Sequence, residues 1–212
     1  MVSILMLALS ISSAYLIGSF PTSFILAKIF KGIDIRDVGS KNAGATNVLR
    51  TVGKIPAVIT LVVDVLKGVF AVTIVAGFFY AFGIDLVYDF YRCLLGLVVV
   101  CGHIWPVFLK FKGGKGIATT LGVAIALAPK ILLPSAVIWF LVFSLTSYVS
   151  LASILSLISF PVISALFGGS LYVTLLSVIL CVISIYKHKE NIKRLMRGEE
   201  NKTRLFTKNK PS

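Results

Sequence analysis

The chain has 212 residues, of which 58% are hydrophobic and only 14% are charged. Soluble domains average about 45–50% apolar and about 25% charged residues, so one soluble core of this length cannot bury the excess and part of it must face lipid. The net charge of +13 indicates contact with nucleic acid, an anionic lipid surface or anionic substrates.

Long apolar segments predict about seven membrane-spanning helices. Each needs about 20 apolar residues, with about 17 as the lower bound. The stretch 117–187 is continuously apolar, but Pro129, Pro134, Pro161 and the pair Gly168–Gly169 divide it into four short helices. Five spans remain the alternative if two of these helices are re-entrant. The predicted spans are 3–27, 56–81, 91–109, 117–133, 135–150, 151–167 and 171–187.

The basic residues predict an orientation for these spans. Of the 21 Lys and Arg residues, 18 lie between the first two spans, between the third and fourth, or after the last. The positive-inside rule makes that side cytoplasmic, which puts the N-terminus outside and the C-terminus inside. The first span lacks a basic leader and a clear cleavage site, so we expect it to be retained. Residues 1–212 are therefore expected to form one all-α, polytopic, membrane-embedded domain.

The first polar cytoplasmic segment runs from Gly39 to Arg50. Its two glycines permit a close approach to a ligand, and residues 44–52 are predicted to form a short interfacial helix that ends at Gly53. Ser40 precedes this helix, where backbone N–H groups favour an anion. If the helix starts slightly earlier, Asn42, Thr46 and Arg50 share one face. The alternative is a solvated loop.

The second polar segment, 102–120, contains a Lys-Gly-Gly-Lys-Gly turn at 112–116 before an apolar helix. Successive N–H groups in such a turn can form an anion nest, although the Walker A pattern is absent. A flexible hinge is the alternative. His103 lies just inside the membrane, where an ionisable group is either functional or a neutral, hydrogen-bonded residue.

The third polar segment, 188–200, is predicted to continue the last span. His188, Asn191 and Arg194 are three residues apart and would cover one arc of a helix. An ordinary basic anchor for lipid headgroups is the alternative. Within the second span, Asp64 and Lys67 are three residues apart and must be paired, either as a structural ion pair or in support of a site.

Together these segments resemble the PlsY family of bacterial glycerol-3-phosphate acyltransferases. The resemblance covers about 16–202 and is carried by GSKNAGATNVLR at 39–50, GHIWPVFLKFKGGKGIATTLG at 102–122 and HKENIKRLMRGEE at 188–200. The pair Asp64 and Lys67, followed by Gly68, also matches. One departure is Lys41, because the family usually has glycine there.

The resemblance implies seven membrane helices in the bacterial plasma (inner) membrane, with the site facing the cytoplasm. It implies acyl transfer from acyl phosphate to the 1-hydroxyl of glycerol 3-phosphate, which gives lysophosphatidic acid and inorganic phosphate. It also implies that no metal, no cofactor, and no acyl carrier protein or CoA takes part directly. Nucleic acid is not expected as a partner, because the basic residues are spread over three loops without a recognition helix.

The resemblance also implies roles for individual residues. The catalytic set is Ser40, Arg50, Lys115, His188 and Asn191. The substrate-binding set is Asn42, Thr46, Asn47, His103, Lys112, Gly113, Gly114, Gly116, Arg194 and Glu200. Two phosphate groups bring roughly four negative charges, which the cations must offset. The general base stays open among His103, His188 and a substrate phosphate.

Two other functional classes account for part of the pattern. A transporter for organic phosphates would also need anion-binding loops and spans, but it would need polar groups on both sides and near the midplane. Here the polar segments lie on one side, and the spans carry only Asp64 and Lys67 as charged residues in their interior. A lipid-binding scaffold would not need Ser, Asn and His at set spacings.

Overall fold

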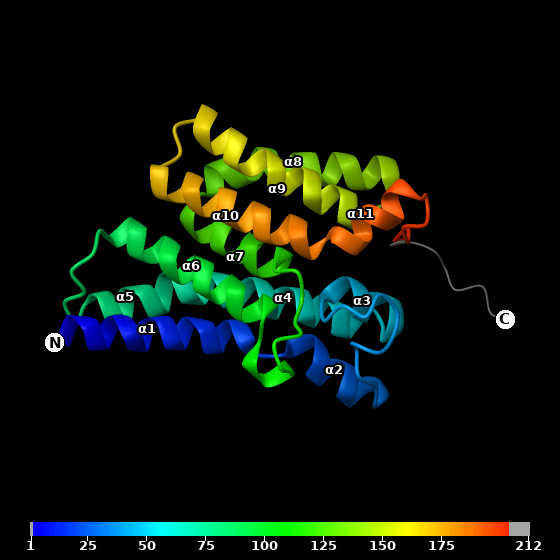
Figure 1. The fold of residues 1–212 in the computed structure, drawn as a ribbon, viewed down its shortest axis with the longest axis horizontal. Helices are drawn as coiled ribbons and strands as arrows, with labels where there is room; N and C mark the ends of the chain where they lie inside the picture. Colours follow the sequence, from blue (N-terminus) through cyan, green and yellow to red (C-terminus); the bar gives the residue numbers. More distant parts are fainter. Residues whose placement is uncertain (1, 204–212) are drawn as a thin grey trace.

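The structure is a computed structural model that describes residues 2–203. Helices and connecting loops make up this range, and no strand occurs within it (Figure 1). The helices are α1 (Val2–Ser19), α2 (Thr22–Lys31), α3 (Ala45–Thr51), α4 (Lys54–Phe70), the π-helix η1 (Ala71–Val75), α5 (Ala76–Tyr80), α6 (Tyr88–Ile104), the 3₁₀-helix η2 (Val107–Leu109), α7 (Ile117–Leu127), α8 (Pro129–Thr146), α9 (Val149–Leu166), α10 (Leu171–Lys187) and α11 (Lys189–Met196).

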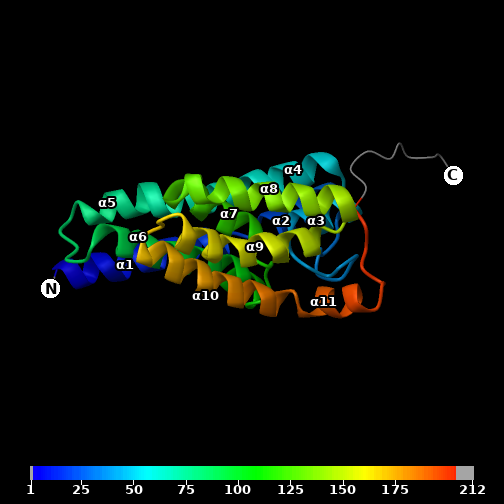
Figure 2. The same cartoon turned by 90° about the horizontal axis from the view of Figure 1, so that it is seen from above.

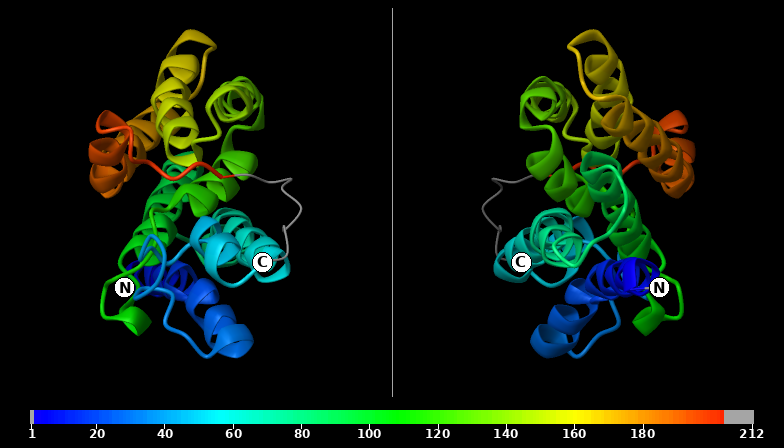
Figure 3. Two further views of the ribbon diagram at one scale, coloured as in Figure 1. Left: turned by 90° about the vertical axis from the view of Figure 1, so that its right-hand side faces the viewer. Right: turned by 90° about the vertical axis from the view of Figure 1, so that its left-hand side faces the viewer.

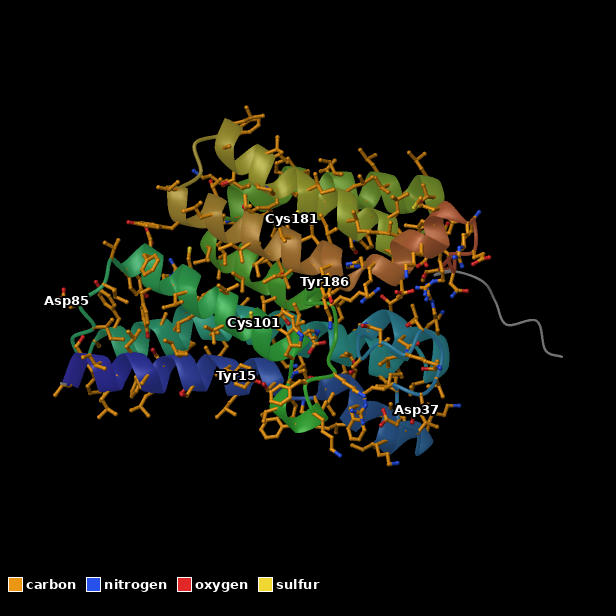
Figure 4. All side chains as sticks on the ribbon, in the orientation of Figure 1. Tyr15, Asp37, Asp85, Cys101, Cys181 and Tyr186 are labelled. Carbon is orange, nitrogen blue, oxygen red and sulfur yellow. The ribbon has the colours of Figure 1, made fainter. Side chains whose placement is uncertain are left out.

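The helices are arranged along one long axis. Figure 1 shows α1, α4, α5 and α6 in one group, α8, α9 and α10 in another, and α7 between the groups, and Figure 2 shows the long helices of both groups running along the same axis. The N-terminus lies at one end of this axis, and α3 and α11 lie at the other. Figure 4 shows many side-chain nitrogen atoms at the α3 and α11 end. This clustering agrees with the predicted one-sided distribution of basic residues, of which Arg204, Lys208 and Lys210 lie outside the described range.

Five helical segments among the described residues are long and apolar enough to cross a membrane, and six are if α10 and α11 count as one bent span. The predicted spans 3–27, 56–81 and 91–109 correspond to segments of 30, 27 and 22 residues. The predicted count of seven is not confirmed. The remaining apolar helix, α7, has 11 residues and is about 16 Å long, which is about half of the hydrocarbon core.

The apolar stretch 117–187 does contain four helices, but the predicted boundary between the first two is wrong. The break expected at Pro134 occurs at Ala128, so the segments 117–133 and 135–150 become α7 and α8. Pro129 occupies the first turn of α8, where its missing N–H costs little. Pro134 lies inside α8 with its ring exposed, and Pro161 lies inside α9, as membrane helices tolerate.

The short helix α7 contacts the first helix group at its middle and near its C-terminal end. A Cβ atom on Gly122 would lie 1.9 Å from the Val65 carbonyl oxygen of α4, so only glycine permits this crossing. Arg92 of α6 donates to the Ala126 carbonyl at 3.0 Å and satisfies one orphan acceptor at the C-terminal end of α7. With α7 packed in this way, its N-terminal residues line the cavity described below.

Candidate active site

One cavity of about 770 Å³ lies between the two helix groups. This volume is within the range of small-molecule sites, which is about 300–1,000 Å³. Residues from all three polar segments line one end, so the structure brings these distant stretches of chain together. The polar residues along the cavity include Ser40, Asn42, Thr46, Asn47, Arg50, Lys54, Asp64, His103, Lys115, Ser150, His188, Asn191, Glu200 and Thr203.

The other end of the cavity is apolar. Aromatic side chains of α8 and α9 line it, together with aliphatic residues of α4, α7 and α10. Trp139 stacks on Phe143 with ring centroids 5.1 Å apart and donates its indole N–H to the Ser153 hydroxyl at 3.2 Å. A cavity with one cationic end and one apolar end suits an amphiphile that has an anionic head.

The loop before α3 is shaped by Asn47, whose side chain is only 1% exposed. Its amide nitrogen donates to the carbonyls of Ile35, Val38 and Asn42 at 3.0–3.1 Å, and its oxygen accepts the Ser40 N–H at 2.9 Å. These bonds use both amide donors on the protein. The structure therefore shows Asn47 fixing the loop that carries Ser40, and Asn47 also lines the cavity, so its predicted contact with substrate stays a prediction.

Arg50 reaches from α3 across the mouth of the cavity. Helix α3 begins at Ala45, so Thr46 and Arg50 share it while Asn42 stays in the preceding loop. The Arg50 Nη2 atom donates to the Asn201 carbonyl at 3.0 Å and to the Thr203 hydroxyl at 2.9 Å. Burial lowers the pKa of Arg50, and Glu200 opposes that shift, but a guanidinium stays charged.

The glycine turn 112–116 differs from the predicted anion nest. The N–H groups of Gly113 and Gly114 donate to the carbonyls of Ile104 and His103, both at 3.2 Å, so they are not free to bind phosphate. A Cβ atom on Gly114 would lie 2.2 Å from His103 Nε2, which explains the need for glycine. Lys112 is exposed and does not line the cavity.

Lys115 and Gly116 do line the cavity, at the N-terminal end of α7. The Lys115 ammonium donates a short hydrogen bond to Asn191 Oδ1. Burial lowers the pKa of Lys115 to about 8, and repulsion from Arg194 and Arg50 adds to the shift although Glu200 opposes it. A desolvated cation beside a helix N-terminus is a favourable place for an anion.

His188 lies at the junction of α10 and α11, which are bent by 60°. The last span therefore does not continue straight but bends at His188, which is the N-cap of α11 and is followed on that helix by Asn191 and Arg194. The His188 Nδ1 atom lies 2.7 Å from the Ser184 carbonyl oxygen. Because that carbonyl oxygen can only accept, Nδ1 carries the hydrogen and donates. The other ring nitrogen, Nε2, is then able to accept a proton or a hydrogen bond from a hydroxyl group.

Glu200 connects the third polar segment to α9. Its carboxylate accepts from Ser150 at 2.9 Å, from Asn191 at 2.7 Å and from Arg194 at 2.8 Å. Burial raises the pKa of Glu200, but these three bonds outweigh it and hold the pKa below its ordinary value. Arg194 thus forms an ion pair with Glu200 and does not itself line the cavity. Sequence reasoning missed Ser150, because a serine inside an apolar segment carries no local signal.

Asp64 and Lys67 form a buried ion pair with Nζ and Oδ1 2.5 Å apart. Lys67 also donates to the Phe20 carbonyl at 2.6 Å, and Thr22 donates to Asp64 at 3.4 Å. His103 Nδ1 lies 3.7 Å from the same carboxylate. The pair is buried, and Asp64 and His103 also line the cavity, so both alternatives for the pair, a structural role and support of the site, stay open. No three His, Cys, Asp or Glu residues within 2–203 are grouped as a metal site requires.

Comparisons with known proteins agree on one family. The family model described as glycerol-3-phosphate acyltransferase matches residues 8–198. A glycerol-3-phosphate acyltransferase of Thermoanaerobacter pseudethanolicus is 46% identical over 189 residues, which are 89% of this chain and 91% of that protein. The corresponding protein of Fusobacterium nucleatum is 45% identical over 188 residues, or 89% of this chain and 93% of that protein.

Solved structures of PlsY, an integral membrane glycerol 3-phosphate acyltransferase, are similar as well. Its glycerol 3-phosphate form matches with a TM-score of 0.84 and 40% identity, covering 93% of this chain and 96% of that one. Its lysophosphatidic acid form matches with a TM-score of 0.81 and 39% identity, covering 93% and 95%. With its long apolar helices, this chain is therefore a multi-pass membrane protein.

Proposed function

The chain belongs to the glycerol-3-phosphate acyltransferase family, and from that premise we propose that it transfers a fatty acyl group from acyl phosphate to the 1-hydroxyl of glycerol 3-phosphate. The products are lysophosphatidic acid and inorganic phosphate. The observation that carries this proposal is the cavity, in which Arg50, Lys115 and His188 line one end and apolar side chains line the other. An acyl phosphate has the same division into an anionic head and an apolar chain.

The reaction is a direct displacement at the acyl carbonyl. The 1-hydroxyl oxygen attacks the carbonyl carbon, the bond from that carbon to the phosphate oxygen breaks, and the released proton leaves with inorganic phosphate. Arg50 binds the phosphate of glycerol 3-phosphate, because Nε and Nη1 have no protein acceptor within the described residues. Ser40, His188 and Asn191 surround the glycerol part. Lys115 and the N-terminal end of α7 stabilise charge on the acyl phosphate.

We propose acyl phosphate as the acyl donor. It is a mixed anhydride with a good leaving group, so no covalent nucleophile is required. An apolar cavity also limits hydrolysis by excluding water. We propose that neither CoA nor acyl carrier protein takes part directly. We also propose that the protein lies in the bacterial plasma membrane with this site facing the cytoplasm, which the one-sided basic residues support.

The test uses purified protein in detergent with acyl phosphate and labelled glycerol 3-phosphate. We expect labelled lysophosphatidic acid and inorganic phosphate in equal amounts, and no product from acyl-CoA. Arg50→Ala should reduce turnover by at least about 100-fold, as expected when a charged contact to the reacting groups is lost. Arg197→Ala is the matched control, because Arg197 is exposed at the end of α11 and does not line the cavity.

The same assay separates acyl transfer from the transport of organic phosphates. A transporter moves its substrate across a closed membrane and makes no product in detergent micelles. Absence of lysophosphatidic acid in detergent, with uptake of glycerol 3-phosphate into sealed vesicles, would replace the proposed function by transport. Normal turnover of Arg50→Ala would remove Arg50 from the assigned site.

A further inference from the structure

The segment Glu199–Thr203, which we call the strap, crosses the end of the molecule at the mouth of the cavity. Figure 3 shows it in red, leaving α11 and passing between the upper helices and the blue-to-cyan helices below. Glu200 fastens its first part to Ser150 of α9. The Thr203 N–H donates to the Ser147 carbonyl at 2.9 Å, and Thr203 is only 6% exposed.

The strap joins two parts of the site that have little other connection. Helix α3, which carries Arg50, packs mainly on α4 and α2, whereas α11 packs on α9 and α10. The hydrogen bonds from Arg50 to the Asn201 carbonyl and the Thr203 hydroxyl span this division. The place of the Arg50 guanidinium relative to His188 and Asn191 therefore depends on the strap.

We propose that Thr203 is a positioning residue for Arg50, and that its hydroxyl holds the guanidinium ready for the phosphate of glycerol 3-phosphate. The proposal rests on the proposed function, because it takes Arg50 as the phosphate ligand. An arginine side chain has several rotatable bonds, and fixing it before binding reduces the entropy lost when the substrate binds. Thr203 suits this role because its own backbone is tied to the turn between α8 and α9.

The test compares Thr203→Val with Thr203→Ser. Valine keeps the shape of threonine but has no hydroxyl, whereas serine keeps the hydroxyl that accepts from Arg50. We expect Thr203→Val to raise KM for glycerol 3-phosphate roughly tenfold, while kcat and KM for acyl phosphate stay within about twofold. Thr203→Ser should keep KM for glycerol 3-phosphate within about twofold of the wild-type value. Equal KM values in wild type and Thr203→Val would overturn the proposal, and so would a KM in Thr203→Ser as high as that in Thr203→Val.

A second comparison asks whether Thr203 acts through Arg50. In an Arg50→Lys background the compact ammonium cannot keep the same fork of donors, so adding Thr203→Val should change KM by less than about twofold. A full tenfold effect in that background would show that Thr203 acts by another route and would overturn the proposal.

Direct binding keeps this inference separate from the proposed function. Calorimetry with glycerol 3-phosphate alone, in detergent and without donor, should show the same roughly tenfold weaker binding for Thr203→Val. If wild type makes no lysophosphatidic acid, the proposed function fails while the binding ratio still decides the role of Thr203. If wild type is active and the binding ratio is one, only the role of Thr203 fails.

Discussion

Two clusters of partly or wholly buried charge reach the same cavity in this protein, and they differ in their balance of positive and negative charge. Asp64 and Lys67 form a neutral pair, and Lys67 also donates to a backbone carbonyl. At the polar end of the cavity, Arg50, Lys115 and Arg194 lie near a single carboxylate, that of Glu200. A balanced pair completes its hydrogen bonds within the protein, whereas an excess of cations leaves charge for an anionic ligand. We expect this difference in charge balance to make the first cluster contribute mainly to stability and the second mainly to ligand binding.

The largest expected effect breaks the balanced pair. Lys67→Met leaves the Asp64 carboxylate buried without a partner, so we expect the free energy of unfolding to fall by about 3–5 kcal/mol. Thermal unfolding in detergent measures the change. Lys31→Met, at the exposed end of α2, is the control and should change stability by less than about 0.5 kcal/mol.

The double variant Asp64→Asn with Lys67→Met sharpens this test. Removing both charges leaves no uncompensated ion, so the double variant should recover most of the stability that Lys67→Met loses. If the costs of the two single substitutions simply add, Asp64 and Lys67 do not act as a pair, and the contrast between the two clusters fails.

A smaller effect, on activity, tests the cationic cluster through pH. The pKa of Lys115 is lowered to about 8, so its ammonium is present below that pH and is lost above it. We expect kcat/KM to fall about tenfold per pH unit above pH 8. The fall in kcat should begin at higher pH, because a bound phosphate raises the pKa of Lys115 again. Steady-state kinetics between pH 6 and 10 measures both.

Lys115→Arg is the matched variant, because a guanidinium stays protonated throughout this range. It should lose the alkaline fall in kcat/KM, and an unchanged fall would assign that titration to another group. The free energy of unfolding should change with pH in the opposite direction to kcat/KM. Because the folded chain gives up the Lys115 proton near pH 8 and the unfolded chain near 10.5, this residue makes the unfolding free energy rise with pH between those values.

The smallest expected effect concerns backbone strain in the loop before α3. Lys41 adopts a left-handed conformation with φ of 58°, which is costly for any residue with a Cβ atom. The greater flexibility of glycine in the unfolded chain offsets part of the gain, so Lys41→Gly should raise the free energy of unfolding by about 0.5–1 kcal/mol. The shift in Tm reports it.

Lys41→Ala separates strain from charge. Both substitutions remove the ammonium, but alanine keeps the unfavourable backbone, so only glycine should stabilise the protein if strain dominates. Equal stabilisation by both would indicate that removing the Lys41 charge has a larger effect than relieving backbone strain. If only glycine stabilises the protein, backbone strain explains why the family prefers glycine at this position.

Local patterns predicted some of these features because they depend only on nearby residues. The apolar stretches predicted the helices of the first three spans, and the break at Gly168–Gly169 also occurs. The short helix expected at 44–52 is α3. The break expected at Pro134 does not occur, because the ring faces outward and the helix continues past it. Whether a proline ends a helix depends on its surroundings in the folded protein, and the pattern of apolar residues in the sequence does not reveal them.

By itself the sequence determined that the chain is helical and apolar enough to require lipid, and that three basic, glycine-containing segments belong to one family pattern. Only the tertiary structure decided that Asn47 serves its own loop, that Lys112 stays outside the cavity, and that Ser150 and Thr203 join the site. The reason is physical: composition and spacing fix what a short segment can form, but a hydrogen bond between residues 50 and 203 exists only once the helices between them have packed.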